Sequence, residues 1–228
     1  MDPLLQRLVP VLESTALLWN VLFVDDGSRD GTFGKLKEVR KSDSRIRGIR
    51  LAENRGQQNA VYCGLCQADS ELIITMDDDL QHPPELIPEL ISRVSDGADL
   101  VYAVSRGKGR PFLLRGGTAL NSLFFTLFLR KPSRVEIGSY RIFTRSLVDR
   151  IKGEKRAFIY VSALVFRLRP GAEVRSFRFS KVPSVHREPS RFSFRGRVRL
   201  FSRLFRHYGP FRFLFLHHGE PYRIEEVL

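Results

Sequence analysis

The sequence contains few cysteines and no long apolar run. Two cysteines among 228 residues cannot staple a small secreted scaffold, so that class is excluded and a reducing compartment fits. No apolar stretch reaches the ~18 residues of a membrane-spanning helix, and the N-terminus has no signal-peptide pattern. From these absences we expect a chain that is soluble or lies on a surface.

Acidic residues are also scarce relative to basic ones. The chain has 38 Lys and Arg against 25 Asp and Glu, which gives a formal net charge of +13. This imbalance favours a polyanionic partner, either nucleic acid, anionic lipid or a phosphorylated substrate. The hydrophobic content of 43% suffices for a core and excludes disorder over most of the length. The length fits one ordinary domain with a small appendage.

Short apolar runs alternate with helical patterns in the first half of the chain. We expect strands over 21–24, 46–51, 71–76 and 99–104, and helices over 4–18, 33–41, 57–68 and 85–95. This alternation predicts an α/β fold with a mostly parallel sheet and helices on both faces. The chain opens on a helix, so we expect the usual first strand to be missing and the 21–24 strand to keep an unpaired edge.

Three adjacent aspartates follow the apolar strand 71–76 and precede a pair of prolines. Neighbouring carboxylates repel one another, and a bound cation offsets that repulsion. In an extended segment alternate side chains share a face, so Asp77 and Asp79 can converge on one hard cation while Asp78 points away. A solvated acidic loop is the competing interpretation of a D-x-D pattern. The strand before it and the prolines after it favour the cation site.

Two more polar loops follow predicted strands. Asp25, Asp26, Gly27 and Ser28 follow the first strand, and Asn54, Gly56 and Gln57 follow the second. Ligands of open α/β sheets bind at these carboxyl ends. His82 follows the aspartates and has two open interpretations, a contact with a diphosphate or a structural bond to the backbone. Cys63 and Cys66 lie inside a predicted helix, where core packing is favoured over redox chemistry or zinc binding.

The second half of the chain is strongly basic. Residues 186–212 contain eight arginines and one acid. One helical stripe carries Phe194, Val198, Phe201 and Phe205, and another carries Arg195, Arg199, Arg203 and Arg206. A basic amphipathic helix with aromatic residues is typical of a helix that lies in a membrane interface. A solvated basic face is the competing interpretation.

Four motifs occur in the order found in a known family. They are Val24-Asp25-Asp26-Gly27-Ser28, Asn54-x-Gly56-Gln57, the stretch from Met76 to Glu85, and Gly138-Ser139-Tyr140-Arg141. Together they make residues 2–206 resemble the family-2 glycosyltransferases of GT-A fold, a Rossmann-like α/β fold. The likeness is greatest to the polyprenyl-phosphate branch, which includes dolichyl-phosphate mannose synthase and undecaprenyl-phosphate sugar transferases. It implies an inverting transfer of a sugar from a UDP- or GDP-sugar to a polyprenyl phosphate.

The resemblance also implies roles for individual residues. Mg²⁺ or Mn²⁺ would be held by Asp79, with Asp77 and Gln81. The nucleotide sugar would contact Asp25, Asp26, Gly27, Ser28, Asn54, Gly56, Gln57, Asp77 and Asp78. The acceptor phosphate would contact Arg106, Arg115, Arg141, Arg187 and Ser190. The residues expected to be catalytic are Asp79, Arg106 and Arg115.

The chain departs from the family pattern in three places. We expect the strand and loop that normally precede Leu4 to be absent, a family glycine is missing from 187–192, and Phe192 replaces a tyrosine. In addition, we expect the C-terminal membrane helices of many bacterial relatives to be missing. We expect a glycosyltransferase domain over 1–185, a basic membrane-interface segment over 186–212 and a tail over 213–228.

The implied location is cytoplasmic and peripheral, on the inner face of an anionic membrane, with no nucleic-acid partner. Two other functions stay open on the residues alone. One is a non-catalytic remnant that still binds a nucleotide sugar, and the other is a basic module for RNA or acidic lipid. A polymerising synthase is disfavoured, because it would usually carry a Q-x-x-R-W motif and several membrane spans.

Overall fold

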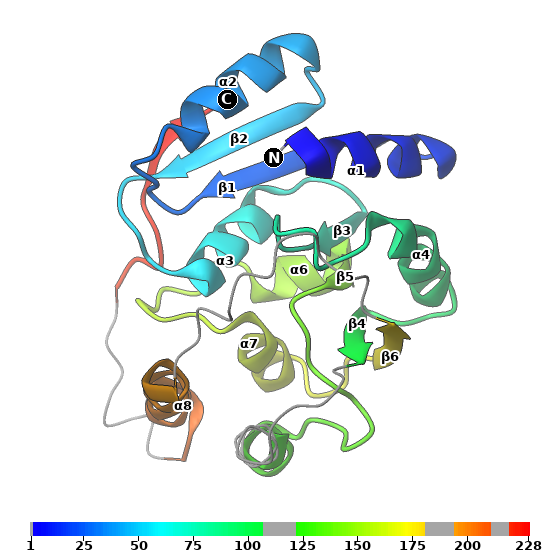
Figure 1. Ribbon diagram of the computed structural model, residues 1–228. Helices are drawn as coiled ribbons and strands as arrows, with labels where there is room; N and C mark the ends of the chain where they lie inside the picture. The colour runs from blue at the N-terminus through cyan, green and yellow to red at the C-terminus, as the bar shows by residue number, and fades with distance from the viewer. Residues whose placement is uncertain (1, 107–121, 181–193, 211–218) are drawn as a thin grey trace.

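A computed structural model describes residues 2–106, 122–180, 194–210 and 219–228 (Figure 1). Within these residues the strands form two sheets, ordered β1-β2-β7 and β3-β5-β4-β6. The first contains β1 (Val21–Asp25), β2 (Ile46–Leu51) and β7 (Ile224–Val227). The second contains β3 (Leu72–Thr75), β5 (Arg141–Thr144), β4 (Leu100–Arg106) and β6 (Val174–Ser180). The expected α/β class is confirmed, with the strands divided between two sheets.

The pairing within these sheets is mixed, where the pattern predicted a mostly parallel sheet. Among the described strands, β1–β2 and β4–β6 are parallel, and β2–β7, β3–β5 and β4–β5 are antiparallel. β5 begins with Arg141 opposite Thr75, at the end of β3, and runs back between β3 and β4. This reversal brings the Gly138–Arg141 motif to the carboxyl end of β3.

Each sheet among the described residues has two open edges, formed by β1 and β7 in the first sheet and by β3 and β6 in the second. β1 pairs only with β2, and β3 pairs only with β5. The apolar side chains of β1 from Val21 to Val24 are only half-buried, although the sequence predicted a buried strand. The unpaired edge expected for the 21–24 strand is thus present in this part of the chain.

Residues 219–228, expected to belong to a tail, pack on the first sheet. β7 pairs with β2, and the Leu228 N–H donates to the Gly48 carbonyl at 2.7 Å. The Asn59 side-chain amide donates to the Pro221 carbonyl at 2.8 Å. This pairing was not predictable from the sequence, because a four-residue segment with two glutamates forms a strand only where an open sheet edge accepts it.

The four helices predicted in the first half of the chain are present, although the first ends at Ser14 instead of at 18. The helices of the described residues are α1 (Asp2–Ser14), α2 (Thr32–Ser42), α3 (Gln57–Gln67), the 3₁₀ turn η1 (Pro84–Leu86), α4 (Ile87–Ser95), a helix over 122–129, α6 (Arg145–Ile151), α7 (Val161–Leu168) and α8 (Phe194–Tyr208). Pro84 opens η1, as a proline in a first helical turn should. None of the helices described is long and apolar enough to cross a bilayer.

The largest core cluster lies between the second sheet and the helices below it in Figure 1. Its buried side chains include Tyr62 of α3, Phe125 of the 122–129 helix, Leu164 of α7 and Leu204 of α8. The α8 helix is therefore anchored through one face, while α2 and the first sheet lie at the opposite end of the molecule (Figure 1). This packing holds α3, α7 and β5 together near the strand ends.

Candidate functional site

Loops after β1 and β2 are joined by one carboxylate. Asp26 accepts hydrogen bonds from the backbone N–H groups of Arg55 at 2.7 Å and Gly56 at 2.9 Å. Burial raises the pKa of Asp26 above its usual value despite these two bonds. Gly27 has φ +72°, and a Cβ there would lie 2.9 Å from the Asn54 nitrogen. Glycine is required at this point because the two loops pass so close together.

Asp25 ends β1 with one unsatisfied oxygen. Its side chain is buried, and Oδ1 accepts the Ser28 N–H at 2.9 Å. Oδ2 is buried and has no hydrogen-bond partner, although it is ion-paired with Arg50 Nε at 3.8 Å. Arg50 Nε also lies 3.4 Å from Glu225 Oε2. A buried carboxylate oxygen in this state calls for a donor, such as a hydroxyl or N–H of a ligand.

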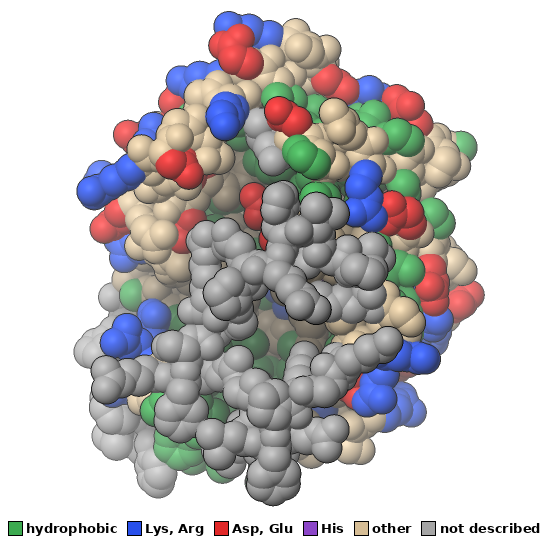
Figure 2. Space-filling view, viewed as in Figure 1, with side chains coloured by type: hydrophobic (Ala, Val, Ile, Leu, Met, Phe, Trp, Pro, Cys, Tyr) green, Lys and Arg blue, Asp and Glu red, His purple; other side chains and the backbone are tan. Residues whose placement is uncertain are grey.

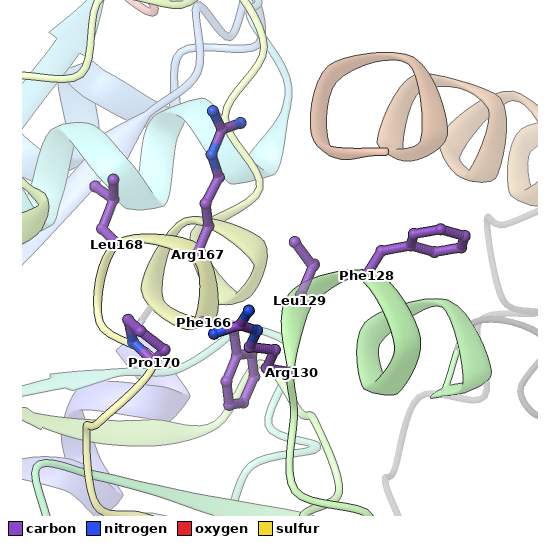
Figure 3. A pocket seen from close by; sticks show the side chains of 7 residues that line it. All are labelled: Phe128, Leu129, Arg130, Phe166, Arg167, Leu168 and Pro170. Atoms are coloured by element: carbon purple, nitrogen blue, oxygen red, sulfur yellow. The ribbon is translucent and has the colours of Figure 1, made fainter. Parts of the chain in front are cut away.

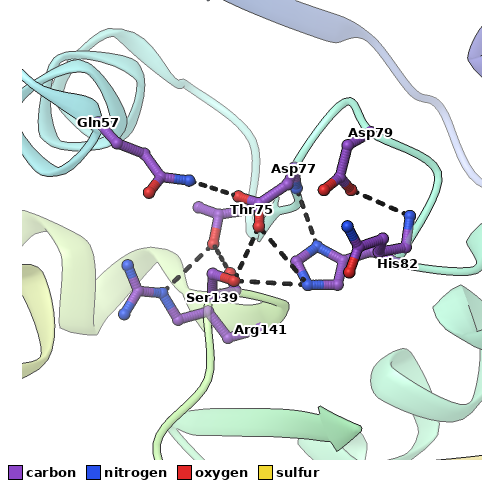
Figure 4. Close-up of polar contacts among 8 residues, drawn as sticks. Gln57, Thr75, Asp77, Asp79, His82, Ser139 and Arg141 are labelled. Atoms are coloured by element: carbon purple, nitrogen blue, oxygen red, sulfur yellow. Dashed lines mark hydrogen bonds and ion pairs between the residues drawn. The ribbon is translucent and has the colours of Figure 1, made fainter. Parts of the chain in front are cut away.

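Asp77 is held by residues from three separate elements (Figure 4). The Gln57 amide at the start of α3 donates to Oδ1 at 2.7 Å, and the Ser139 hydroxyl before β5 donates to Oδ2 at 3.0 Å. The Asp77 N–H donates to His82 Nδ1 at 2.9 Å. The motif that contains Asp77 therefore contacts the motifs that contain Gln57 and Ser139 through this one carboxylate.

His82 makes the backbone contact that the sequence left as one of two options. Because Nδ1 accepts a hydrogen bond, the proton of the neutral imidazole lies on Nε2. Nε2 is 3.4 Å from the Ser139 hydroxyl and 3.7 Å from Asp77 Oδ2. The ring stacks on Tyr140, with centroids 5.0 Å apart and planes 18° apart. His82 thus packs into the wall of the site.

Asp78 and Asp79 lie on the turn that follows. Both are exposed, and Asp79 Oδ1 accepts the Gln81 N–H at 3.0 Å. The intervening Leu80 has φ +60°, which bends the backbone sharply. No group of three or more His, Cys, Asp or Glu side chains converges on a metal position within the described residues. In donor type, the carboxylate and amide oxygens of Asp79 and Gln81 still fit a hard divalent cation.

Arg141 is the main cation near this cluster, and it is buried at 2% exposure. Its Nε donates to the Thr75 hydroxyl at 3.3 Å, and Nη1 donates to the Ser162 hydroxyl at 2.8 Å. The Tyr102 hydroxyl donates to the same Ser162 oxygen at 2.9 Å. The sequence indicated Arg141, but it did not indicate Thr75, Tyr102 or Ser162. The only signal for Ser162 is a single small polar residue in the apolar α7.

The other predicted acceptor residues are placed only in part. Arg106 ends β4 and is exposed. Arg115, Arg187 and Ser190 lie outside the described residues. The face in Figure 2 shows acidic side chains in the hollow at the upper edge of the undescribed atoms.

A pocket of about 310 Å³ lies at the other end of α7 (Figure 3). It is lined by Phe128, Leu129, Arg130, Phe166, Arg167, Leu168 and Pro170. These residues come from the ends of the 122–129 helix and of α7, whereas Ser162 lies at the N-terminal end of α7. The pocket therefore shares no lining residue with the strand-end cluster.

The α8 helix is amphipathic, but its faces differ from the predicted stripes. Leu204 and Tyr208 are buried, and Phe201 is half-buried against Phe124. Val198 and Phe205 are exposed. The predicted arginines Arg199, Arg203 and Arg206 are also exposed, while the side chains of Phe194 and Arg195 are outside the description. The stripe predicted as one apolar surface is thus divided between core contact and solvent.

The neighbouring 122–129 helix extends this exposed apolar surface. Leu123, Leu127 and Phe128 are exposed, with Leu127 at 64%. The ring centroids of Phe128 and Phe205 are 6.1 Å apart, so the exposed apolar side chains of the two helices form one patch. Exposed apolar patches rimmed by polar groups mark sites of interaction. The sequence missed the contribution of the 122–129 helix because apolar helices are normally buried.

Comparisons with known proteins agree on one family and one fold. The profile described as Glycosyl transferase family 2 matches residues 2–152. An uncharacterized glycosyltransferase YkcC of Bacillus subtilis (strain 168) is 33% identical over 161 residues, which cover 70% of this chain and 50% of that protein. The undecaprenyl-phosphate 4-deoxy-4-formamido-L-arabinose transferase of Salmonella choleraesuis (strain SC-B67) is 28% identical over 208 residues, which cover 86% and 60%. The chain thus spans about half to three-fifths of the length of these relatives.

Two solved structures share the fold. The mannosyltransferase PcManGT from Pyrobaculum calidifontis, in complex with GDP-Man and Mn²⁺, has a TM-score of 0.60 at 17% identity, covering 97% of this chain and 63% of that one. The glucosyl-3-phosphoglycerate synthase from Mycobacterium tuberculosis, in complex with Mn²⁺, UDP-glucose and phosphoglyceric acid, has a TM-score of 0.56 at 18% identity, covering 88% and 75%. At these identities the likeness concerns the fold alone.

Proposed function

The chain belongs to glycosyl transferase family 2, and from this premise we propose that it moves a sugar from a nucleotide sugar to the phosphate of a polyprenyl lipid. One observation carries the proposal. The loops after β1, β2 and β3 and the turn before β5 are tied into one site by Asp26 on Gly56 and by Gln57 and Ser139 on Asp77. These are the four motifs that the sequence places far apart.

The donor side would lie on the loops after β1 and β2. The buried, unsatisfied Oδ2 of Asp25 offers an acceptor to a base or ribose of the nucleotide. We assign seven more residues to the nucleotide-sugar side: Asp26, Gly27, Ser28, Asn54, Gly56, Gln57 and Asp78. The solved neighbours hold GDP-Man or UDP-glucose, which supports a nucleotide-sugar donor without choosing the base.

The leaving group would be met by the acidic turn. Asp79 and Gln81, with Asp77 beside them, are the residues that would hold Mg²⁺ or Mn²⁺. When bound, such an ion neutralises the charge that develops on the leaving nucleoside diphosphate. Gln57 and Ser139 already occupy both oxygens of Asp77, so Asp79 carries most of the binding in this arrangement. The Mn²⁺ complexes of the solved neighbours support a divalent ion.

The acceptor would approach from the cationic side. Its phosphate oxygen is already anionic, so no strong general base is needed, and positioning and electrostatics supply the catalysis. Arg141 and Arg106 are the described cations assigned to it, together with Arg115, Arg187 and Ser190. Direct attack by that oxygen on the anomeric carbon inverts its configuration. The name of the Salmonella relative supports a polyprenyl phosphate as the acceptor.

Docking on a membrane would bring the lipid phosphate to the site. The exposed patch of Leu127, Phe128 and Phe205 would enter the interface, while arginines of α8 contact anionic headgroups. The proposed location is therefore the cytoplasmic face of a membrane, with peripheral attachment.

The test is transfer from UDP- and GDP-sugars to a short-chain polyprenyl phosphate, with Mg²⁺, Mn²⁺ or EDTA. We expect one donor to yield a lipid-linked sugar only when a divalent ion is present. Metal-dependent donor binding without transfer would favour the non-catalytic alternative, in which the site binds a nucleotide sugar but does not turn it over. Failure of every donor to bind would refute both.

A further inference from the structure

Arg141 is a buried cation with no carboxylate partner among the described residues. Its side chain is 2% exposed, and within the described part of the chain no carboxylate pairs with it. Arginine stays protonated in proteins, so this site carries a full positive charge. An unpaired charge away from water is costly, and folded proteins rarely keep one without a reason.

The groups that hold the guanidinium are all neutral. Hydroxyls of Thr75 and Ser162 accept its hydrogen bonds, and Tyr102 donates to Ser162 from behind. The ring centroids of Phe143 and Tyr102 are 5.2 and 5.9 Å from the guanidinium carbon. Hydroxyls and ring faces orient a guanidinium without cancelling its charge. An aspartate at the position of Ser162 would have cancelled it.

The helix beside this cation adds positive potential. Ser162 is the second residue of α7 (Val161–Leu168), and the neutral side-chain oxygen of Gln58 accepts the Val161 N–H there at 3.3 Å. The N-terminus of a helix carries positive partial charge and favours anions. Both the arginine and the helix end therefore favour an anionic ligand at this point.

We propose that Ser162 and Thr75 are positioning residues that keep Arg141 oriented and unneutralised for an oxygen of a bound phosphate. This deepens the proposed function and rests on it for the identity of the phosphate. Thr75 also donates to the Ser139 carbonyl at 3.0 Å, and Ser139 donates to Asp77. The same hydroxyls thus set Arg141 relative to the carboxylate on the donor side (Figure 4). The phosphate is either the acceptor monoester or the donor diphosphate, and the test separates the two.

The test compares Ser162→Asp with Ser162→Asn in the full chain. The two side chains have nearly the same shape, so the comparison isolates the added charge beside Arg141. Calorimetry would measure three ligands without sugar transfer: inorganic phosphate, a short prenyl monophosphate, and a nucleoside diphosphate with Mg²⁺. We expect Ser162→Asp to bind phosphate about 10- to 100-fold more weakly than Ser162→Asn. The reason is that the new carboxylate pairs with Arg141, so the ligand loses a charged hydrogen bond from that side chain. Ser95→Asp, on the exposed side of α4, controls for net charge.

The outcomes are distinct. Weaker binding of the two monophosphates alone assigns Arg141 to the acceptor, and weaker binding of the diphosphate alone assigns it to the donor. Equal affinities of Ser162→Asp and Ser162→Asn for all three ligands overturn the inference. Because binding is measured without turnover, an inactive protein that keeps the affinity difference refutes the proposed function and leaves this inference standing.

Thermal unfolding of Arg141→Met gives an independent measurement if Ser162→Asp does not fold. Removing an unpaired buried charge is expected to raise the melting temperature of the ligand-free protein, while phosphate no longer stabilises the variant. A lower melting temperature than that of the wild type would mean that Arg141 holds the fold together, and it would overturn the inference. In turnover assays, Ser162→Thr should keep the wild-type KM for the assigned phosphate substrate, because threonine retains the hydroxyl.

Discussion

The two sheets satisfy the charged groups at their ends in opposite ways. In the first sheet and its loops, Asp25 and Asp26 accept hydrogen bonds from backbone N–H groups of neighbouring loops. In the second, Arg141 is held by side-chain hydroxyls from β3 and α7. Backbone N–H groups are present in every loop, so an acid at a strand end finds a donor wherever another loop passes close to it. Asp77 at the end of β3 is the exception, because the side chains of Gln57 and Ser139 supply its donors. A cation needs side chains or carbonyls brought to it by tertiary packing.

This difference divides the site into an acidic half and a cationic half. Asp25, Asp26 and Asp79 lie at the ends of β1 and β3, where the leaving group and its cation would bind. Arg141 lies at the start of β5, where phosphate charge would be met. Glycosyl transfer to an anionic acceptor brings two negative groups to one sugar, and separate halves allow each to be neutralised. The predictions below test that separation.

The largest effect is expected from Asp79→Ala. We expect it to abolish metal-dependent donor binding and to slow transfer on the order of 10²-fold or more, because the acidic half loses the carboxylate assigned to the divalent ion. The fold should remain intact, since removing one of three neighbouring acids relieves repulsion. Calorimetry with donor and Mn²⁺, beside a melting curve, measures both.

Asp69→Ala is the matched control for that change. Asp69 is an exposed acid that precedes β3, at the end of the strand away from the site. It should leave donor binding and metal response unchanged. A lower melting temperature for Asp79→Ala with unaltered metal response would show that the aspartate cluster is structural.

A smaller effect is expected on membrane attachment through the arginines of α8, outside the two halves of the site. Replacing Arg195, Arg199, Arg203 and Arg206 by glutamine should weaken sedimentation with anionic vesicles about tenfold or more. Each arginine near such a surface contributes about 1 kcal/mol before screening. High salt should weaken the wild type similarly. Transfer to a lipid acceptor should slow more than hydrolysis of the donor.

The corresponding lysine variant keeps the charge and should still sediment. Arg203 also stacks on Phe158, with 4.1 Å between its guanidinium carbon and the ring centroid. If the glutamine variant mainly loses thermal stability, α8 is a core helix and the electrostatic docking is wrong. Equal sedimentation with neutral and anionic vesicles would contradict it as well.

The smallest effect concerns Asp26 in the acidic half. Burial raises its folded-state pKa above the unfolded value, so the folded protein binds the proton more tightly. Its contribution to stability is therefore greatest at low pH and falls as the pH rises from about 4 through the raised pKa. Relative to Asp26→Asn, the wild type should lose less than about 1 kcal/mol over that range, because the side chain is only half-buried and solvent screens it. Denaturant titrations at several pH values measure this difference, and a difference that grows in the opposite direction would contradict the assignment.

Much of the first half of the chain was predictable. The strand over 46–51 and the helices near 33–41 and 57–68 lie within a residue or so of the predicted bounds. Their apolar periods are strong, and glycines mark the loops. The contact of Gln57 with Asp77 follows from placing both motifs at strand ends, which the sequence already indicated. Family membership, the α/β class and the acidic half rest on such local patterns.

The cationic half and the sheet pairing were not predictable in the same way. β7 needs the open edge of β2, and the antiparallel insertion of β5 depends on where its loop arrives. The exposed Leu127 and Phe128 read as core residues until the packing of the 122–129 helix is known. Each case depends on contacts between segments that are distant in sequence, and local propensity carries no information about those contacts.

The amino-acid sequence by itself determined which acids stand at the strand ends, because a strand followed by a polar, glycine-bearing loop is a local pattern. Only the tertiary structure decided that Arg141 would be buried against Ser162, Thr75 and Tyr102, with no acid paired to it in the part of the chain that the structure describes. Charge and burial are properties of an environment, and that environment is assembled from β3, β4, β5 and α7. A serine in an apolar helix acquires its role only when folding places it beside a cation.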